Sequence, residues 1–178
     1  QCRYVGGAVR DALLGVDAVD VDIATRLLPD QVMAALADAG IKAVPTGIEH
    51  GTITAVLPDG PVEITTLRRD VSTDGRRATI AYTDDWQQDA ARRDFTMNAL
   101  YADARGQLLD PLHGLPDLLA RRVRFVGDAE TRIREDYLRI LRFFRFTAWY
   151  GDPGLGMDAE GLAACAAGID GLHALSKE

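Results

Sequence analysis

The segment VDVDIAT, residues 19–25, constrains the fold more strongly than its length suggests. In this segment three β-branched side chains alternate with the carboxylates of Asp20 and Asp22. β-Branched residues favour strands, and successive side chains of a strand point to opposite faces. The alternation therefore predicts a strand over 19–24 with one apolar face. Its other face carries two like charges, about 7 Å apart along the backbone.

Strand and helix patterns alternate along the first two thirds of the chain, which predicts a mixed α+β unit. The last third turns all-helical, as if a second domain began there. We expect strands in 2–7 and 51–68, with a hairpin at Asp59-Gly60, a mobile loop over 68–85, and helices in 8–15, 29–40, 86–103, 129–150 and 158–168.

The 178 residues are 47% hydrophobic and 26% charged, which is typical of one globular domain or of one domain and part of a second. The sequence contains neither an apolar run long enough to span a membrane nor a signal-peptide pattern. Cys2 and Cys165 are isolated and have no disulfide or zinc spacing, so we expect a reducing, cytoplasmic setting. A start without methionine leads us to expect a fragment of a longer protein.

The net charge of −7 argues, taken alone, against a nucleic-acid partner. The charge is unevenly placed, however, because eight arginines and four acids lie between Arg121 and Arg145. A net-acidic chain can hold a basic groove, since the local field matters more than the sum. Composition therefore leaves an RNA or nucleotide partner open.

The motif GGAVRD, residues 6–11, indicates a phosphate-binding turn. Gly6 and Gly7 remove side chains between a strand and a helix and expose backbone N–H groups, which suit an anion. Arg10 lies on the first turn of the predicted helix and can reach the same anion. The alternative is a tight strand-to-helix turn with a solvated arginine, since a Gly-Gly pair is a weak signal.

The two aspartates downstream of this turn are candidate metal ligands. Mg²⁺ binds one or two carboxylates and completes its shell with water and phosphate oxygens. Glu63, on the strand predicted in 51–68, can point to the same side as Asp20 and Asp22 if the two strands are neighbours. The alternative is a half-exposed strand whose acids are solvated.

Two arginine-containing segments complete the candidate site. In RRDFTMNALY, residues 92–101, we expect Arg93, Asp94 and Asn98 on one accessible side, where they suit phosphate and ribose hydroxyls. In REDYLRILRFFRF, residues 134–146, the polar positions recur every three residues on a mostly apolar helix. Its Asp136–Arg139 pair can match the hydrogen-bonding edge of a base. The alternative for both segments is a set of structural salt bridges. The helix predicted in 134–146 has two further polar positions, Arg142 and Arg145.

These motifs together resemble a known family. The chain is similar over residues 2–150 to the bacterial class II tRNA nucleotidyltransferases, the CCA-adding enzymes, which are relatives of bacterial poly(A) polymerases. The segments that carry the resemblance are GGAVRD, DVDIAT, VPTGIEHGT, VEITTLRRD, RRDFTMNAL, LLDPLHGLPDL and EDYLRILRFFRF.

The resemblance implies a polymerase β-like nucleotidyltransferase head with a mixed sheet and flanking helices over 1–127. It also implies the start of a helical neck over 128–178, with the body and tail absent. The implied activity is template-independent addition of CCA to the tRNA 3′ end from CTP and ATP, without a membrane or a protein partner. The resemblance implies two catalytic Mg²⁺ ions on Asp20 and Asp22, with Glu63 less certain. It implies triphosphate binding by Gly6, Gly7, Arg10 and Arg93, and ribose reading by Asp94 and Asn98. It also implies base reading by Asp136 and Arg139, with further nucleotide contacts by Arg142 and Arg145.

Two other functions stay open at this point. A poly(A) polymerase shares the chemistry and differs in its acceptor, and a non-catalytic nucleotide- or RNA-binding module belongs to another class. The intact pair of aspartates argues against the module. The choice among CCA, CC-only and A-only addition also stays open.

Overall fold

The computed structural model describes residues 2–18, 20–74 and 77–175, and its centre is a seven-stranded mixed sheet in the order β3-β4-β5-β2-β1-β8-β9. A separate two-stranded ribbon is formed by β6 and β7. The strands are β1 (Cys2–Val5), β2 (Asp22–Thr25), β3 (Lys42–Gly47), β4 (Thr52–Leu57), β5 (Gly60–Thr66), β6 (Arg68–Asp74), β7 (Arg77–Tyr82), β8 (Tyr101–Ala102) and β9 (Leu108–Leu109).

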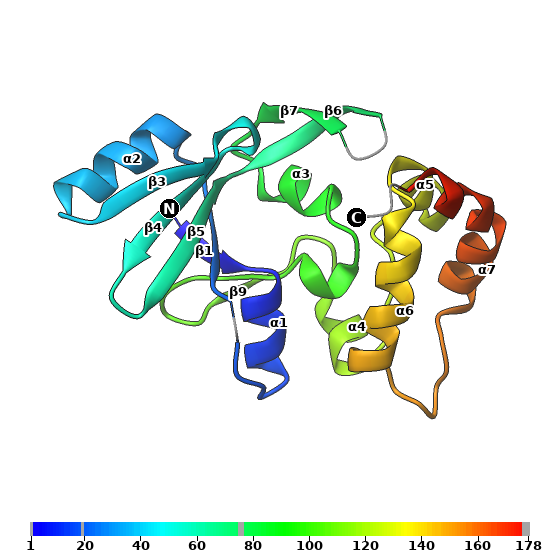
Figure 1. The fold of residues 1–178 in the computed structure, drawn as a ribbon. Helices are drawn as coiled ribbons and strands as arrows, with labels where there is room; N and C mark the ends of the chain where they lie inside the picture. The colour runs from blue at the N-terminus through cyan, green and yellow to red at the C-terminus, as the bar shows by residue number, and fades with distance from the viewer. Residues whose placement is uncertain (1, 19, 75–76, 176–178) are drawn as a thin grey trace.

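Helices flank the sheet and continue beyond it, as Figure 1 shows. α2 packs on the β3-β4-β5 side of the sheet, whereas α5, α6 and α7 form a separate group at the opposite side of the molecule. This arrangement confirms the predicted α+β class. The helices are α1 (Gly7–Leu13), α2 (Pro29–Asp38), α3 (Trp86–Ala91), α4 (Leu115–Leu119), α5 (Ala129–Glu135), α6 (Leu138–Tyr150) and α7 (Ala159–Ala167), with 3-10 turns η1 (Ile48–His50), η2 (Thr96–Asn98) and η3 (Ile169–Ala174).

The strand β2 is central, since it pairs antiparallel with β1 and parallel with β5. It begins at Asp22, so Asp20 lies before the strand and not in it as predicted. The register places Asp22 opposite Val5 on one side and opposite Glu63 on the other. The end of β1 that leads into the glycine turn therefore lies beside the predicted carboxylates.

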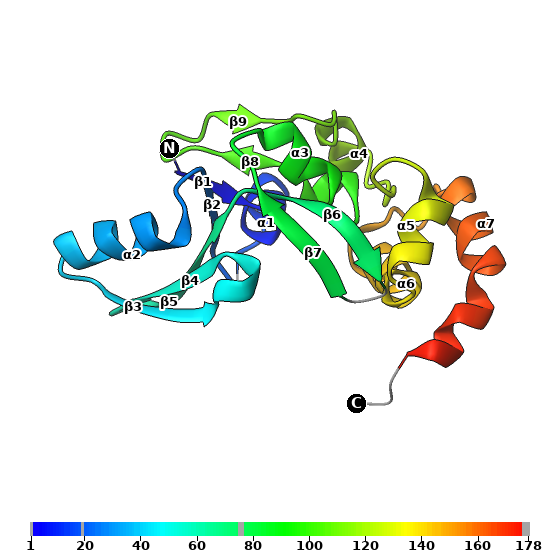
Figure 2. The same cartoon turned by 90° about the horizontal axis from the view of Figure 1, so that it is seen from above.

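The polar segment 68–85 is a ribbon of two strands and not the predicted loop. Figure 2 shows that the ribbon extends from the sheet toward α5 and α6. A two-stranded ribbon with little burial needs no apolar face, so its sequence lacks the alternation that identifies other strands. The tip of the predicted loop, 75–76, lies outside the described residues.

Two predicted helices are interrupted. The helix expected over 86–103 ends at Ala91, and Phe95 is extended, with φ −118° and ψ 147°, in a bridge to Phe125. The helix expected over 129–150 breaks at Asp136, whose φ is −156° and whose carboxylate accepts a hydrogen bond from the Leu138 N–H at 3.0 Å. Tertiary pairing in the first segment and this local cap in the second outweigh helix propensity.

One aromatic cluster joins the sheet part to the helical part. Phe95 lies 5.1 Å from Phe146 and 6.4 Å from Phe143 between ring centroids, and Phe125 stacks on Phe143 at 5.4 Å. All four side chains belong to the same buried core. The position of α6 relative to the sheet is therefore set by packed rings on both sides.

The described ranges contain no helix with the length and apolar character that a membrane crossing requires. Cys2 is exposed and Cys165 is buried, and both are free thiols.

We expect Phe143→Ala to lower the free energy of unfolding by about 4 kcal/mol, because it leaves a cavity where the two parts meet. The side chain of Phe143 is 0% exposed. Urea denaturation of the chain measures the change. The adjacent Phe144→Ala is the matched control, since Phe144 is 40% exposed, and we expect it to cost less than about 1 kcal/mol. Equal losses in the two variants would contradict the assigned packing.

Candidate active site

The three predicted carboxylates line one pocket. Asp20, Asp22 and Glu63 surround a space of about 320 Å³, whose other lining residues are Val21, Thr54 of β4 and Pro61 of β5. Because Asp22 and Glu63 are partners in the parallel register, their side chains lie on the same face of the sheet. The structure thus brings together acids that are separated by some forty residues in the sequence.

Asp20 and Asp22 are the pair that fits a divalent cation. Burial raises the pKa of Asp22, the positive charge of Arg93 lowers it in part, and the negative charge of Asp20 raises it further. A bound cation would offset this repulsion, and Mg²⁺ needs no more than one or two protein carboxylates. Within the described ranges, no group of three His, Cys, Asp or Glu side chains is placed to hold a metal ion, so the exposed Glu63 does not complete a three-acid set.

The glycine turn and Arg93 lie against each other beside these acids. Gly6 has φ +66°, a conformation that costs a side-chain-bearing residue energy, and a Cβ atom there would lie 3.6 Å from Nη1 of Arg93. Gly7 begins α1. The backbone of the turn and a guanidinium therefore share one side of the site, as the sequence predicts for a phosphate contact.

A buried carboxylate that the sequence analysis missed orients Arg93. Asp89 is 1% exposed, and its Oδ2 accepts hydrogen bonds from Arg93 at 3.1 Å and from the Tyr101 hydroxyl at 2.7 Å. Its Oδ1 accepts from Arg92 at 2.9 Å and from the Arg68 N–H at 3.2 Å. Asp89 precedes Arg92 by three residues and Arg93 by four in a predicted helix. Side chains at these spacings meet on one helix face, and this pattern could have indicated the ion pairs.

Arg10 is buried and bonded to protein groups. Its Nη1 donates to Oδ1 of Asn98 at 2.7 Å, and its Nη2 donates to the Tyr150 hydroxyl at 2.6 Å. Nε and Nη2 also donate to the two oxygens of Asp11, at 2.8 and 3.0 Å. The structure therefore directs Arg10 toward α6 and η2, whereas the resemblance implies a triphosphate contact.

The two predicted ribose readers belong to a network between the two parts. Asp94 accepts from Nδ2 of Asn98 at 3.0 Å with one oxygen and from Nε of Arg142 at 2.8 Å with the other. Arg93 donates to Asp89, while its Nη1 and the Asn98 carbonyl oxygen lie 3.6 and 3.9 Å from the Cβ position of Gly6. The accessible side shared by Arg93, Asp94 and Asn98 stays a prediction, and the segment that carries it is a turn before the extended Phe95 and not the predicted helix.

The predicted base-reading pair is not a salt bridge in the structure. Nη1 of Arg139 donates to Glu135 at 2.5 Å and to the carbonyl of Arg132 at 2.8 Å. Asp136 instead caps the first turn of α6 through the Leu138 N–H. At the helix break the Asp136 carboxylate accepts from the Leu138 N–H, and Glu135, four residues before Arg139, is the ion-pair partner of that arginine.

Arg145 is exposed on α6, as predicted for a residue that contacts a substrate. Its guanidinium lies 5.4 Å from the ring centroid of Trp149 and 5.9 Å from that of Phe146. Trp149 is 66% exposed. A planar cation beside an exposed indole is an arrangement on which nucleic-acid bases can stack.

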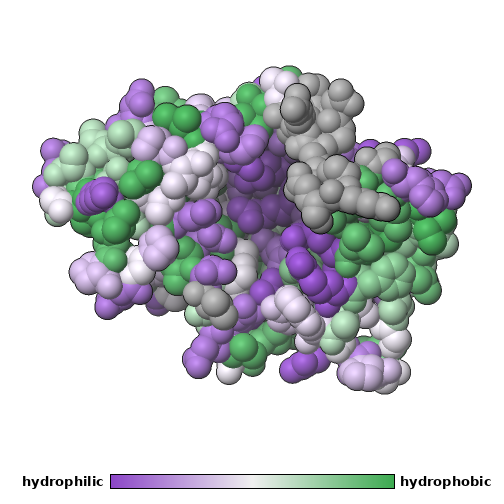
Figure 3. All heavy atoms as spheres, in the orientation of Figure 1, coloured by the Kyte–Doolittle hydropathy of each residue, from purple (hydrophilic) through white to green (hydrophobic). Residues whose placement is uncertain are grey.

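Hydrophilic side chains gather in the hollow between the sheet part and the helical part, as Figure 3 shows. A pocket of about 380 Å³ lies between β6, α3 and α5, and its lining includes Arg69, Arg92, Arg132 and Glu135. Glu135, which lines this pocket, directly precedes Asp136, so the pocket adjoins the predicted base-reading segment.

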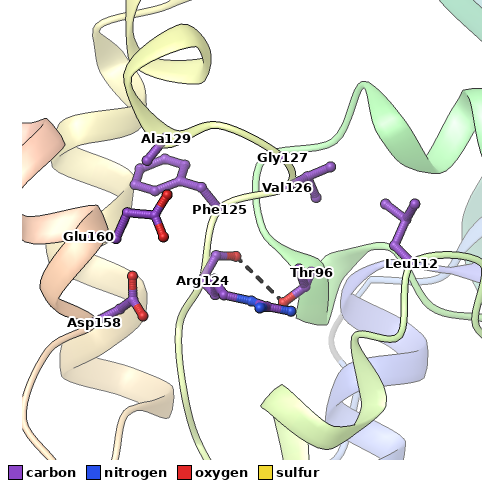
Figure 4. Close-up of a pocket in the computed structure, with 9 residues that line it drawn as sticks. All are labelled: Thr96, Leu112, Arg124, Phe125, Val126, Gly127, Ala129, Asp158 and Glu160. Atoms are coloured by element: carbon purple, nitrogen blue, oxygen red, sulfur yellow. Dashed lines mark hydrogen bonds between the residues drawn. The ribbon is translucent and has the colours of Figure 1, made fainter.

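A smaller pocket of about 260 Å³ lies where the chain passes from the sheet part to the helices (Figure 4). There the carbonyl oxygen of Arg124 accepts a weak hydrogen bond from the Thr96 hydroxyl at 3.5 Å, and Asp158 and Glu160 of the α7 end face it. Its lining contains none of the predicted site residues, so we do not assign it to the substrate.

A mixed sheet with paired acids at the start of a central strand, next to a glycine turn, has the architecture of a nucleotidyltransferase head. Enzymes that transfer nucleotidyl groups generally use divalent metal ions. The chain belongs to the family of poly A polymerase head domains, whose model matches residues 2–124.

Several relatives agree with this placement. The mitochondrial CCA tRNA nucleotidyltransferase 1 of Homo sapiens is 48% identical over 100% of this chain and 41% of its own length. The CCA-adding enzyme of Streptococcus pyogenes serotype M2 is 47% identical over 83% of this chain and 36% of its own length. The Bacillus stearothermophilus CCA-adding enzyme, solved in complex with CTP, has a TM-score of 0.85 and 36% identity over 99% of this chain and 41% of that chain. The chain thus spans about two fifths of the length of such relatives, and the predicted resemblance is confirmed.

We expect Asp89→Asn to destabilise the protein by about 3 kcal/mol, because it leaves two arginines without their buried counter-charge. Burial alone raises the pKa of Asp89, but Arg93 and Arg92 outweigh it and hold the pKa at about 2, below the ordinary 3.8. The carboxylate therefore stabilises the fold above about pH 4, and this contribution is lost as the pH falls toward 2. Urea denaturation from pH 7 to pH 2.5 measures both effects.

The control for this variant is Asp85→Asn, which changes the same charge at the half-buried N-cap of α3. We expect it to cost about 1 kcal/mol or less. If Asp89→Asn is no less stable than Asp85→Asn at pH 7, Asp89 does not hold the arginines as described.

Proposed function

We propose that this chain is the catalytic part of an enzyme that adds CCA to the 3′ end of tRNA from CTP and ATP, without a nucleic-acid template. The observation that carries the proposal is the pair of acids, Asp20 and Asp22, beside the glycine turn and Arg93. The printed names of the relatives, CCA tRNA nucleotidyltransferase and CCA-adding enzyme, support the choice of reaction. In this proposal 1–127 is the head and 128–178 begins the neck.

In the proposed reaction the 3′-oxygen of the tRNA attacks the α-phosphorus of CTP or ATP. A new P–O bond forms, the bond from the α-phosphorus to the bridging oxygen breaks, and pyrophosphate leaves while the hydroxyl proton passes to solvent. Gly7 and Arg93 lie where they can bind the triphosphate through a backbone N–H group and a guanidinium. The Gly6 N–H donates to the Leu100 carbonyl at 3.3 Å, so Gly6 contributes by leaving the turn free of a side chain. No side chain is needed as a dedicated base.

Asp20 and Asp22 are the residues that would hold Mg²⁺, with two ions expected when a nucleotide is present. When bound, Mg²⁺ lowers the pKa of the attacking hydroxyl and neutralises charge on the triphosphate. The observation that supports a cation there is that Asp20 and Asp22 line one pocket, where burial raises the pKa of Asp22 and the Asp20 charge adds to it. Glu63 is exposed at the rim of the same pocket and is left out of the proposed ligand set.

Base selection is assigned to Asp136 and Arg139, with Arg142 and Arg145 as further contacts. Glu135 holds the Arg139 guanidinium through a hydrogen bond of 2.5 Å and also binds Arg132 at 2.7 Å. A guanidinium held in one orientation presents a fixed set of donors, which is what recognition of a base edge requires. The cytoplasmic setting stays a prediction from the cysteines.

A poly(A) polymerase is the second candidate, and the description of the matching family favours it. The two reactions differ in acceptor and in product length, and a non-catalytic module gives no product. Full-length protein is mixed with tRNA lacking its 3′ end, Mg²⁺, and either CTP plus ATP or ATP alone. Three added nucleotides support CCA addition, long A-tails support the polymerase, and an unchanged tRNA supports the module.

We expect Asp22→Ala to abolish addition and to leave the melting temperature unchanged or higher, because it removes a metal ligand that is otherwise repelled by Asp20. The addition assay and thermal unfolding measure the two results. Asp17→Ala is the control, since it removes an exposed acid from the same connection and should keep full activity. A fully active Asp22→Ala enzyme would refute the assigned metal site.

We expect Glu135→Gln to relax nucleotide choice, because it weakens the bonds that orient Arg139. Misincorporation of UTP and GTP should rise about tenfold relative to CTP and ATP, as expected for the loss of one charge-assisted hydrogen bond. Single-nucleotide addition kinetics measure the ratio. Glu130→Gln, at an exposed position of the same helix, should leave the ratio unchanged, and an equal ratio in both variants would contradict this role of Glu135.

A further inference from the structure

Arg10 occupies the point where α1, η2 and α6 meet. It is 6% exposed, and its donors are directed at Asn98, Asp11 and Tyr150. A guanidinium in this position offers little surface to a phosphate. Its contacts instead connect the glycine turn at the start of α1 with the last residue of α6.

Tyr150 holds Arg10 from the helical part. Its hydroxyl accepts from Nη2 of Arg10 at 2.6 Å and is also hydrogen-bonded to Asp11. Its ring centroid lies 4.1 Å from Cζ of Arg10, which is cation–π distance. These contacts fix the guanidinium at both its edge and its face.

The guanidinium in turn selects one orientation of the Asn98 amide. Oδ1 of Asn98 accepts from Arg10, and Nδ2 of Asn98 donates to Asp94. The flipped amide would place a donor against the guanidinium and an acceptor against the carboxylate. Only one orientation therefore satisfies both neighbours, and it depends on where Arg10 is held.

We propose that Arg10 and Tyr150 are positioning residues that set ribose selectivity by holding the Asn98 amide in this orientation. The proposal rests on the proposed function, in which Asn98 reads the sugar of the incoming nucleotide. In this proposal Arg10 and Tyr150 act through Asn98, to which Arg10 donates a hydrogen bond. Tyr150 carries this role from α6, so the same helix takes part in base selection and in sugar selection.

The test compares two α6 variants that each lose one hydroxyl. Tyr150→Phe keeps the ring and removes the bond to Arg10. Thr147→Val is the matched control, because the Thr147 hydroxyl is buried without a hydrogen-bond partner in the part of the chain that the structure describes. Calorimetry with Mg²⁺ measures the dissociation constants of CTP and 2′-deoxy-CTP for the full-length protein.

We expect Tyr150→Phe to lower the preference for CTP over 2′-deoxy-CTP about three- to tenfold, the change that corresponds to the loss of one ordinary hydrogen bond. Thr147→Val should keep the wild-type preference. Arg10→Lys keeps the charge but loses the fork, and it should lower the preference in the same direction. If Arg10→Lys does not fold, Tyr150→Phe decides the test.

Three results overturn the proposal: a wild-type protein that binds both nucleotides equally, a Tyr150→Phe preference equal to wild type, or the same loss of affinity for both nucleotides. The last result would show a merely structural contact. The proposed function is tested separately by the addition assay. A wild-type protein that prefers CTP, with the preference lost in Tyr150→Phe, supports the positioning role even if no nucleotide is added to tRNA.

Discussion

The arrangement of this protein depends on the packing of Phe95 against the helical part. Its ring lies between Phe125, Phe143 and Phe146, at centroid distances of 5.0 to 6.4 Å, and is fully buried. Asp94, next to Phe95 in the chain, is bonded to Arg142 of α6, while Arg93 stays with Asp89 of α3. Apolar burial thus brings α6 to the sheet, and hydrogen bonds then select the orientation in which the polar groups meet.

Carboxylates hold the arginines of the site in place. Asp89, Asp94 and Glu135 each accept two or more hydrogen bonds from guanidinium groups, so the arginine-rich surface is made of fixed donors. Ordered guanidinium donors can therefore occur in a chain with net charge −7. Asp20 and Asp22 differ, since they line one pocket together: burial raises the pKa of Asp22, and the negative charge of Asp20 adds to this effect.

Local patterns were sufficient for much of the fold. The glycine turn and α2, which begins at Pro29, lie where the sequence places them, because each depends on neighbours in the chain. The strand predicted over 19–24 overlaps β2, which begins at Asp22 and ends at Thr25. The ribbon 68–82 and the break at Asp136 were not predicted. The ribbon carries no buried face to produce an alternating pattern, and the break depends on one side chain capping the next helix.

The sequence by itself determined the family, because the order and spacing of motifs can be read without knowing how the chain packs. The residues assigned to the chemistry stay predictions from that resemblance. Only the tertiary structure decided which groups bond to which. It placed Glu63 opposite Asp22 in the sheet, and it directed Arg10 to Tyr150, 140 residues away. Hydrogen bonds act over about 3 Å, so partners distant in sequence are chosen by the fold and not by local pattern.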